Sequence, residues 1–264
     1  MFSSPSPCLA RTLRVGRSAP ASLFVAFLLG CLAPAAQAGQ LFSSGHGDLG
    51  VTFDGTDLAL EFHGHTGAVI DGQSLEDDTE FEPGDIEILV NQSILVTPSL
   101  SSFLNIPVGD RVYFLSPTEF VDSPFLGLAS EELDPNQWSG DLVWTISGVT
   151  GPGTFLLAAL DSFQNPLLTV GPNESFALEV GGHNHFLYSF SAPGTYEITF
   201  SVQGSLLVDG GPGTELRSGS GTFGFVVPVP EPSLLLSAGS LILCASAVHL
   251  RRVRLPGRHS RPIA

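Results

Sequence analysis

Between residues 39 and 228, apolar residues recur at every second position over short stretches. This two-residue period is typical of β-strands with one buried face, and helical periodicity is nearly absent. The stretches are bounded by Gly, Pro, Asn and Asp, and strands are expected near residues 49–53, 58–62, 86–90, 143–146, 154–158, 186–190, 196–200 and 222–227. The pattern predicts an all-β domain, an antiparallel β-sandwich of the immunoglobulin-like or jelly-roll-like kind.

Three segments between these strands have turn or loop composition. Asp54-Gly55 predicts a hairpin turn. The glycine-rich segment Gly204–Ser220 and the acidic segment Asp71–Asp85 predict loops. The acidic segment offers oxygen ligands for calcium, but its spacing fits no known calcium loop, so we interpret it as a solvated loop.

The C-terminal part contains an uncharged apolar run, Ser233–Leu250, preceded by Pro230-Glu231-Pro232 and followed by Arg251, Arg252 and Arg254. The run is long enough to cross a bilayer as a helix, and the arginines would hold residues 255–264 in the cytoplasm. Residues 229–254 resemble the PEP-CTERM tail of Gram-negative bacteria. The resemblance implies recognition by an exosortase-type sorting enzyme that removes the tail; the alternative is an ordinary single-pass anchor.

The N-terminal part has the composition of a secretory signal. Arg11, Arg14 and Arg17 precede the apolar stretch Ala21–Leu32, and Ala36-Gln37-Ala38 supplies small residues for a signal peptidase. We expect residues 1–38 to be a signal peptide. A lipoprotein signal ending at Cys31 is the alternative, and either signal predicts export to the cell envelope, cell surface or extracellular matrix.

Composition limits the classes of function that residues 39–228 can have. All three cysteines (Cys8, Cys31 and Cys244) lie outside this part, so no disulfide is expected within it. The formal net charge is −16, and Arg111 and Arg217 are the domain's only basic residues apart from histidine. Such a surface repels nucleic acid and favours cations, although solubility alone accounts for most of the acidic residues.

Five histidines of the predicted domain are grouped: His46, the pair His63 and His65, and the pair His183 and His185. Residues two apart in a strand share a face, so each pair presents two imidazoles side by side. The alternation places all five opposite the apolar face. Asp48 and Glu61 accompany them, and counting outward from Asp54-Gly55 places His46 roughly opposite His63.

Neutral imidazole is a common ligand of zinc and related metals. The pattern therefore predicts a zinc-like site formed by His46, Asp48, Glu61, His63, His65, His183 and His185. A solvated polar sheet face is the alternative. The sequence does not determine whether the last histidine pair meets the others in space.

The stretch Gly181–Phe200 combines His183-Asn184-His185, an aromatic strand and Pro193-Gly194-Thr195-Tyr196. It resembles the choice-of-anchor M domain of bacterial surface-anchored proteins. Gly45–Val51, Pro124–Glu132 and Val149–Phe155 resemble further segments of that domain in the right order. Tyr188 stands where the family usually has tryptophan.

The resemblance covers most of residues 41–228 and implies a surface protein whose relatives occur beside zinc or manganese ABC transporters. It matches His46, His183 and His185 to the family's histidines, and His63 and His65 to a second strand where related chains also have histidine. We expect an exported, non-enzymatic protein that binds a divalent metal, zinc or a similar ion. A structural or adhesive matrix protein associated with exopolysaccharide is the alternative. A zinc hydrolase is not favoured, because the sequence contains no nucleophile elbow and no His-Glu-x-x-His helix.

Overall fold

The computed structural model describes residues 39–162, 165–208 and 213–229. The predicted signal peptide, the Pro230-Glu231-Pro232 motif, Arg251, Arg252 and the apolar run at 233–250 lie outside these residues. Within the described part, no helix has the length and apolar character needed to cross a membrane.

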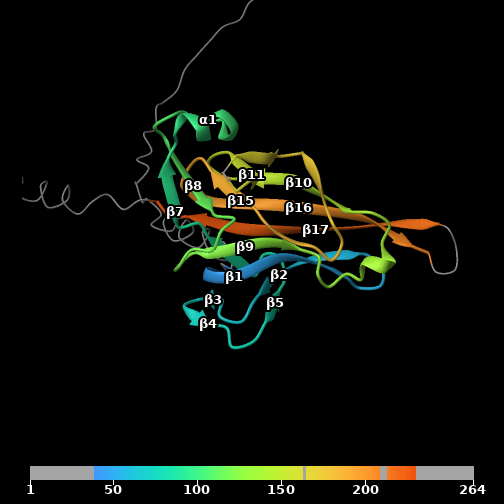
Figure 1. Ribbon diagram of the computed structural model, residues 1–264. Helices are drawn as coiled ribbons and strands as arrows, with labels where there is room; N and C mark the ends of the chain where they lie inside the picture. The colour runs from blue at the N-terminus through green and yellow to red at the C-terminus, as the bar shows by residue number, and fades with distance from the viewer. Residues whose placement is uncertain (1–38, 163–164, 209–212, 230–264) are drawn as a thin grey trace, which may run out of the picture. The chain divides into compact units, whose positions relative to one another are not determined.

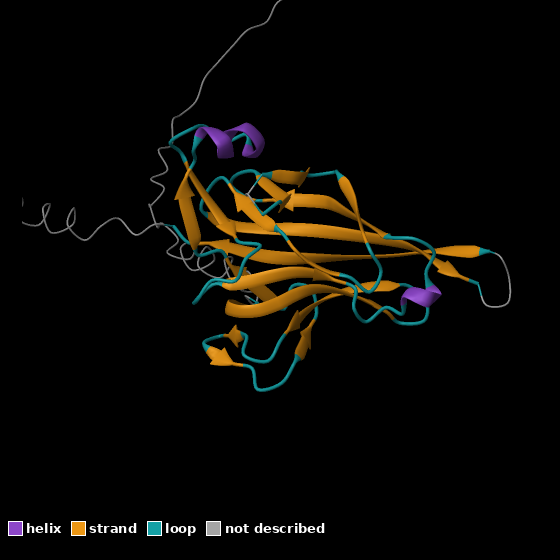
Figure 2. Ribbon diagram, viewed as in Figure 1, coloured by secondary structure: helices purple, strands orange, loops and turns teal. Residues whose placement is uncertain are grey.

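Nearly all regular structure in the described residues is β-strand (Figure 2), as predicted. The strands of the first half are β1 (Gln40–Phe53), β2 (Leu58–Gly64), β3 (Val69–Ile70), β4 (Gln73–Ser74), β5 (Thr79–Phe81), β6 (Ile86–Leu89), β7 (Gln92–Leu95), β8 (Arg111–Leu115) and β9 (Pro124–Ala129). The second half contributes β10 (Leu142–Thr150), β11 (Phe155–Leu160), β12 (Pro166–Val170), β13 (Ser175–Leu178), β14 (His183–His185), β15 (Leu187–Phe190), β16 (Gly194–Leu207) and β17 (Thr214–Val227).

Within the described residues, helical structure is limited to α1 (Pro98–Leu104) and a 3-10 turn at Pro135–Gln137. The threonine side chain at Thr97 caps α1 by accepting a hydrogen bond from the backbone N–H of Leu100, and proline occupies the first helical position. The alternation pattern did not predict this short helix.

The strands form two sheets (Figure 1). The five-stranded sheet has the order β12-β11-β15-β8-β7, and the larger one follows β13-β10-β16-β17-β6-β1-β2-β5. Off this path, β9 pairs with β1 and with β14, and β3 pairs with β1 and with β4. The pairs β1–β6, β1–β9 and β17–β6 are parallel. The prediction of purely antiparallel sheets is therefore wrong. Alternation reports which face a residue occupies, but not the direction of the neighbouring strand.

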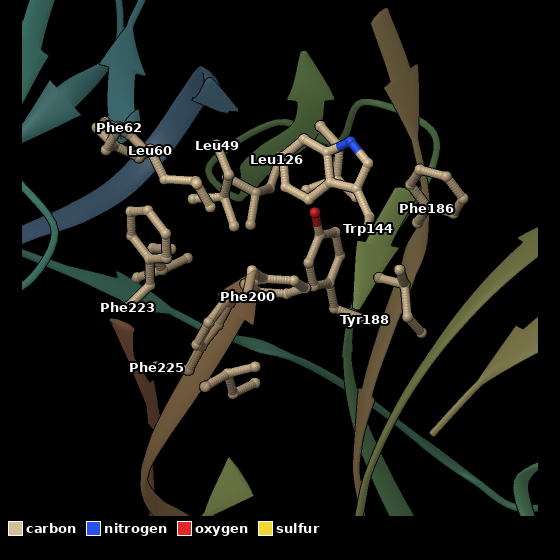
Figure 3. Close-up of a cluster of buried hydrophobic side chains, with 14 of the residues drawn as sticks. Leu49, Leu60, Phe62, Leu126, Trp144, Phe186, Tyr188, Phe200, Phe223 and Phe225 are labelled. Carbon is tan, nitrogen blue, oxygen red and sulfur yellow. The ribbon is translucent and has the colours of Figure 1, made fainter. Parts of the chain in front are cut away.

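Both sheets contribute to one hydrophobic core. The Phe225 ring of the large sheet lies 5.4 Å from the Phe190 ring and 6.0 Å from the Tyr188 ring of the small sheet. Leu49 and Leu126 point into this core in Figure 3. Their sequence neighbours Asp48 and Gly127 consequently face the opposite side of the large sheet.

Two segments predicted as loops contain strand. β16 and β17 form a long hairpin that includes most of Gly204–Ser220. A Cβ at Gly219 would lie 2.2 Å from the Leu58 carbonyl oxygen, so this glycine is required by the close approach of β2. The acidic segment at 71–85 contains β4 and β5, and β5 pairs with β2.

The histidine pair at 183 and 185 does not share a strand with the following aromatic residues. β14 pairs with β9 in the large sheet, whereas β15 pairs with β8 and β11 in the small sheet. The chain therefore changes sheets at Phe186. The alternation predicts that His183 and His185 share one strand with Phe186, Tyr188 and Phe190 and lie on its opposite face. That expectation of a single strand is wrong, because the alternation continues through the change of sheet.

Candidate metal centre

Strand register collects the histidines on the outer face of the large sheet. β9 lies between β1 and β14, and Gly127 pairs with Asp48 on one side and His185 on the other. Two residues further along β9, in opposite directions, Phe125 pairs with His46 and Ala129 pairs with His183. Residues far apart in the sequence therefore occupy neighbouring positions.

β1 changes partners immediately before this site. Its first residues pair with β6 and β3, and residues from Gly45 onward pair with β9. Gly45 has a φ of 87°, which an L-residue rarely adopts, and a Cβ there would lie 2.9 Å from the Cα of Ala68. The glycine thus permits the bend that brings His46 beside β9.

The four residues His46, Asp48, His183 and His185 form the first cluster, each offering a ligand atom within 4.8 Å of the others. His46 Nε2 lies 3.3 Å from His183 Nε2 and 3.4 Å from Asp48 Oδ1, and His183 Nε2 lies 2.9 Å from that oxygen. Ligands at about 2.0–2.1 Å from a tetrahedral zinc ion are roughly 3.3 Å apart. The cluster can therefore hold a metal ion without large rearrangement.

Asp48 is the centre of the cluster and only 1% exposed. Burial alone would raise its pKa, but the nearby His46, His65 and His183 side chains lower that pKa to about 2. In turn, the carboxylate raises the pKa of His46, against the opposing effect of burial. The site thus contains an ionised carboxylate surrounded by imidazoles.

Two buried atoms in this cluster lack hydrogen-bond partners among the described residues. One is Asp48 Oδ1, whose 2.9 Å approach to His183 Nε2 does not have the geometry of a hydrogen bond. The other is His185 Nδ1. Because unpartnered buried polar atoms are costly, their presence in one cluster supports a ligand at this position.

Neighbouring groups orient both histidines of β14. Glu131 Oε2 lies 3.4 Å from His183 Nδ1, which favours the proton on that nitrogen and leaves Nε2 directed at Asp48. The His185 ring stacks on Phe125 with centroids 3.6 Å apart. Burial and the nearby His183 lower the pKa of His185 to about 4, so its imidazole is neutral, the form that binds metals.

Gly127 provides the floor of the first cluster. A Cβ at this position would lie 2.1 Å from Asp48 Oδ1 and 2.7 Å from His183 Nε2. Any side chain would therefore displace the two donor atoms. The glycine leaves the space in which these atoms converge.

A buried serine attaches the turn before β14 to the end of β9. Ser130 Oγ donates to the Glu179 carbonyl oxygen and accepts from the Gly181 N–H, both at 3.1 Å. The Ser130 N–H also donates to the Gly182 carbonyl oxygen at 2.9 Å. These bonds fix the start of β14 and hence the position of His183.

His63 and His65 belong to a second cluster with Asp78. The β1–β2 register pairs Asp48 with His63, and the His65 N–H donates to the His46 carbonyl oxygen. The prediction that His46 lies opposite His63 is therefore wrong by two residues. The turn extends through Asp57, whose carbonyl oxygen bonds the Asp54 N–H, so the point of reversal is displaced from Asp54-Gly55.

Glu61 lies in a third group, with Glu80 and Glu132. Burial, followed by repulsion from Glu80, Glu132 and Glu82, raises the pKa of Glu61 to about 7. Glu61 and Glu132 line a small cleft of about 50 Å³ together with Asp48 and His63. The seven predicted site residues thus lie on one face but divide among three clusters.

Sequence reasoning did not assign Gly127, Ser130, Glu131 or Asp78 to the site. Glu131 and Gly127 are within the segment that resembles the family, but nothing in their spacing indicated a role. The contribution of Gly127, Ser130 and Glu131 depends on the parallel pairing of β1 with β9, which the alternation pattern does not report.

Comparison with protein-family models, with curated proteins and with solved structures gives no match. The resemblance to the choice-of-anchor M domain and to a PEP-CTERM tail therefore stays a prediction from the sequence.

Proposed function

We propose that this protein binds one zinc-like divalent ion through His46, Asp48, His183 and His185. The observation that carries the proposal is the close approach of three possible ligand atoms. The Nε2 atoms of His46 and His183 and the Oδ1 atom of the buried Asp48 lie 2.9–3.4 Å from one another. Nitrogen and carboxylate ligands in this number suit zinc and neighbouring transition metals.

The metal-free explanation is a network of hydrogen bonds around Asp48. It accounts for His65, whose Nε2 lies 2.7 Å from Asp48 Oδ2. It does not account for Oδ1 or for His185 Nδ1, which have no hydrogen-bond partner in the described residues. A cation between the donors would satisfy Oδ1 and the two facing Nε2 atoms together.

Four protein donors favour binding over catalysis. Tetrahedral sites with four protein ligands are structural, whereas catalytic zinc sites keep one position for water. We therefore propose metal capture or storage rather than hydrolysis.

In our proposal the protein acts outside the cytoplasm. The expected signal peptide and sorting tail support export, and the acidic charge would concentrate cations near the site. A metal ABC transporter is the partner that this role suggests. Association with exopolysaccharide is the other partner that the sorting tail suggests.

The test is zinc titration of purified, chelator-treated protein by calorimetry. Asp48→Asn keeps the shape of the side chain but removes the charge, and His183→Ala removes a ligand at a partly exposed position. Each variant should lose zinc affinity at this site by at least about 100-fold, since even outer-shell partners are worth about 10–100-fold. Asp77→Asn, at an exposed aspartate, should bind as the wild type does.

Circular dichroism checks that each variant is folded. Equal zinc affinity in the wild type, Asp48→Asn and folded His183→Ala would overturn the proposal. The structural or adhesive role would then be the better explanation.

A further inference from the structure

The second cluster, His63, His65 and Asp78, is separate from the first but lies beside it. His63 is on β2, His65 follows that strand, and Asp78 precedes β5. Asp78 Oδ2 lies 3.7 Å from His63 Nε2 and 3.6 Å from His65 Nδ1. We propose that these three side chains form a second divalent-cation site, an inference that rests on the proposed function for the class of ion.

The three candidate ligands each use their other polar atom for a contact that orients them. Asp78 Oδ1 accepts hydrogen bonds from the Thr66 N–H at 2.7 Å and the Thr66 hydroxyl at 2.8 Å. This arrangement leaves Oδ2 to face the histidines.

His65 is oriented by the aspartate of the first cluster. Its Nε2 lies 2.7 Å from Asp48 Oδ2, and an ionised carboxylate can only accept a hydrogen bond. Nε2 therefore carries the proton, and the lone pair of Nδ1 is directed toward Asp78. His63 has a longer contact on its other nitrogen, because Glu132 Oε1 lies 3.8 Å from His63 Nδ1. The free atoms of all three ligands thus face a common point.

The site is more open than the first cluster. The Asp78 side chain is 52% exposed, and both histidines are about a quarter exposed. The donor distances exceed the roughly 3.3 Å of a tetrahedral zinc site by a few tenths of an ångström, which exposed side chains can close. Three protein donors leave a position for water, so we expect weaker and more readily exchanged binding than at the first cluster.

Asp48 connects the two sites. Its Oδ1 faces His46 and His183, while its Oδ2 accepts the hydrogen bond from His65. Since a ligand of the first ion orients a ligand of the second, occupancy of one site changes affinity at the other, and the effect is reciprocal.

The experiment counts zinc ions bound to the purified, chelator-treated protein by equilibrium dialysis and elemental analysis. The wild type should bind two equivalents. Asp78→Asn retains an oxygen for Thr66 but replaces Oδ2 with an amide nitrogen that does not ligate. It should keep the tighter equivalent and lose affinity for the weaker one by at least about 100-fold.

The matched control is Asp77→Asn, which removes the same charge from the neighbouring exposed residue. It should bind two equivalents, because Asp77 belongs to none of the clusters. His63→Ala provides a second disruption of the site and should behave as Asp78→Asn does.

The outcomes distinguish this inference from the proposed function. One equivalent, lost in His183→Ala but unchanged in Asp78→Asn and His63→Ala, would overturn the second site and leave the first. Two equivalents with unchanged affinities in both second-cluster variants would also overturn it. No bound zinc in the wild type would overturn both proposals.

Discussion

The first and second clusters use the same types of ligand but are assembled differently. His46, Asp48, His183 and His185 come from β1 and β14, which pair with opposite sides of β9. His63, His65 and Asp78 come from one stretch of chain, residues 63–78. The carboxylate of the first cluster is 1% exposed and that of the second is 52% exposed.

The two clusters therefore illustrate two ways in which a fold can assemble a polar site. Long-range register places the first cluster, and its geometry is as rigid as the sheet that carries it. The second cluster is positioned by the end of β2 and the following loop, where hydrogen bonds from Thr66 hold Asp78. The first therefore suits tight retention of an ion and the second suits exchange with solvent.

The largest expected effect comes from adding a methyl group beneath the first cluster. In Gly127→Ala the new Cβ would displace Asp48 Oδ1 and the His183 ring, so zinc affinity there should fall by at least about 100-fold. Unfolding free energy should fall by about 1–3 kcal/mol, the usual cost of overpacking. Calorimetry and denaturant unfolding measure the two effects.

Gly50→Ala is the control for this variant. Gly50 lies on the same strand and face as Asp48, but a Cβ there would be 3.6 Å from the nearest atom, Glu61 Cγ. Its zinc binding should match that of the wild type. If Gly127→Ala also binds normally, Asp48 and His183 do not form the site.

Changing the residues that orient the histidines should have a smaller effect on zinc affinity, and the affected site should differ between the two clusters. Glu131→Gln weakens the contact that orients His183, and Glu132→Gln weakens the one that orients His63. Glutamine keeps an oxygen in the side chain and loses only the charge, so each loss should be near the lower end of the outer-shell range, about tenfold. Zinc titration should show Glu131→Gln affecting the tighter site and Glu132→Gln the weaker one. Identical effects on both sites would contradict the separation.

The smallest expected change in zinc affinity is that of Ser130→Ala. The variant leaves the Glu179 carbonyl oxygen and the Gly181 N–H without their serine partner, which should cost about 1–3 kcal/mol of unfolding free energy. Zinc affinity at the first cluster should fall less than about tenfold, since Glu131 and Phe125 still orient the β14 histidines. Denaturant unfolding with chelator present, compared with exposed Ser139→Ala, measures the stability. A full loss of zinc binding would show that the turn before β14, rather than Glu131 and Phe125, fixes the position of the β14 histidines.

The all-β character and most strand positions were predictable, because one face of each strand is apolar. Leu49, Val51, Leu60 and Phe62 are all buried as the alternation predicts. The same alternation correctly placed His46 and Asp48 on the opposite face. It did not predict that Asp48 is buried, because the residues around its carboxylate, His46, His65 and His183, come from three separate parts of the chain.

The convergence of His183 with His46 was not predictable from the sequence. It depends on a parallel pairing between β1 and β9 and on the change of sheet after His185. The strand at 214–221 was missed because glycine and serine have low β propensity, and here the close packing of Gly219 against Leu58 outweighs that preference.

His46 and His183 are 137 residues apart in the chain, and their Nε2 atoms are 3.3 Å apart. An ion held between them would act as a cross-link that closes a very long loop. In a disulfide, closing a loop of about 100 residues corresponds to on the order of 4–5 kcal/mol of chain entropy. All three cysteines of this protein lie outside the described domain. The proposed metal would therefore supply the long-range cross-link that disulfides supply in many exported proteins.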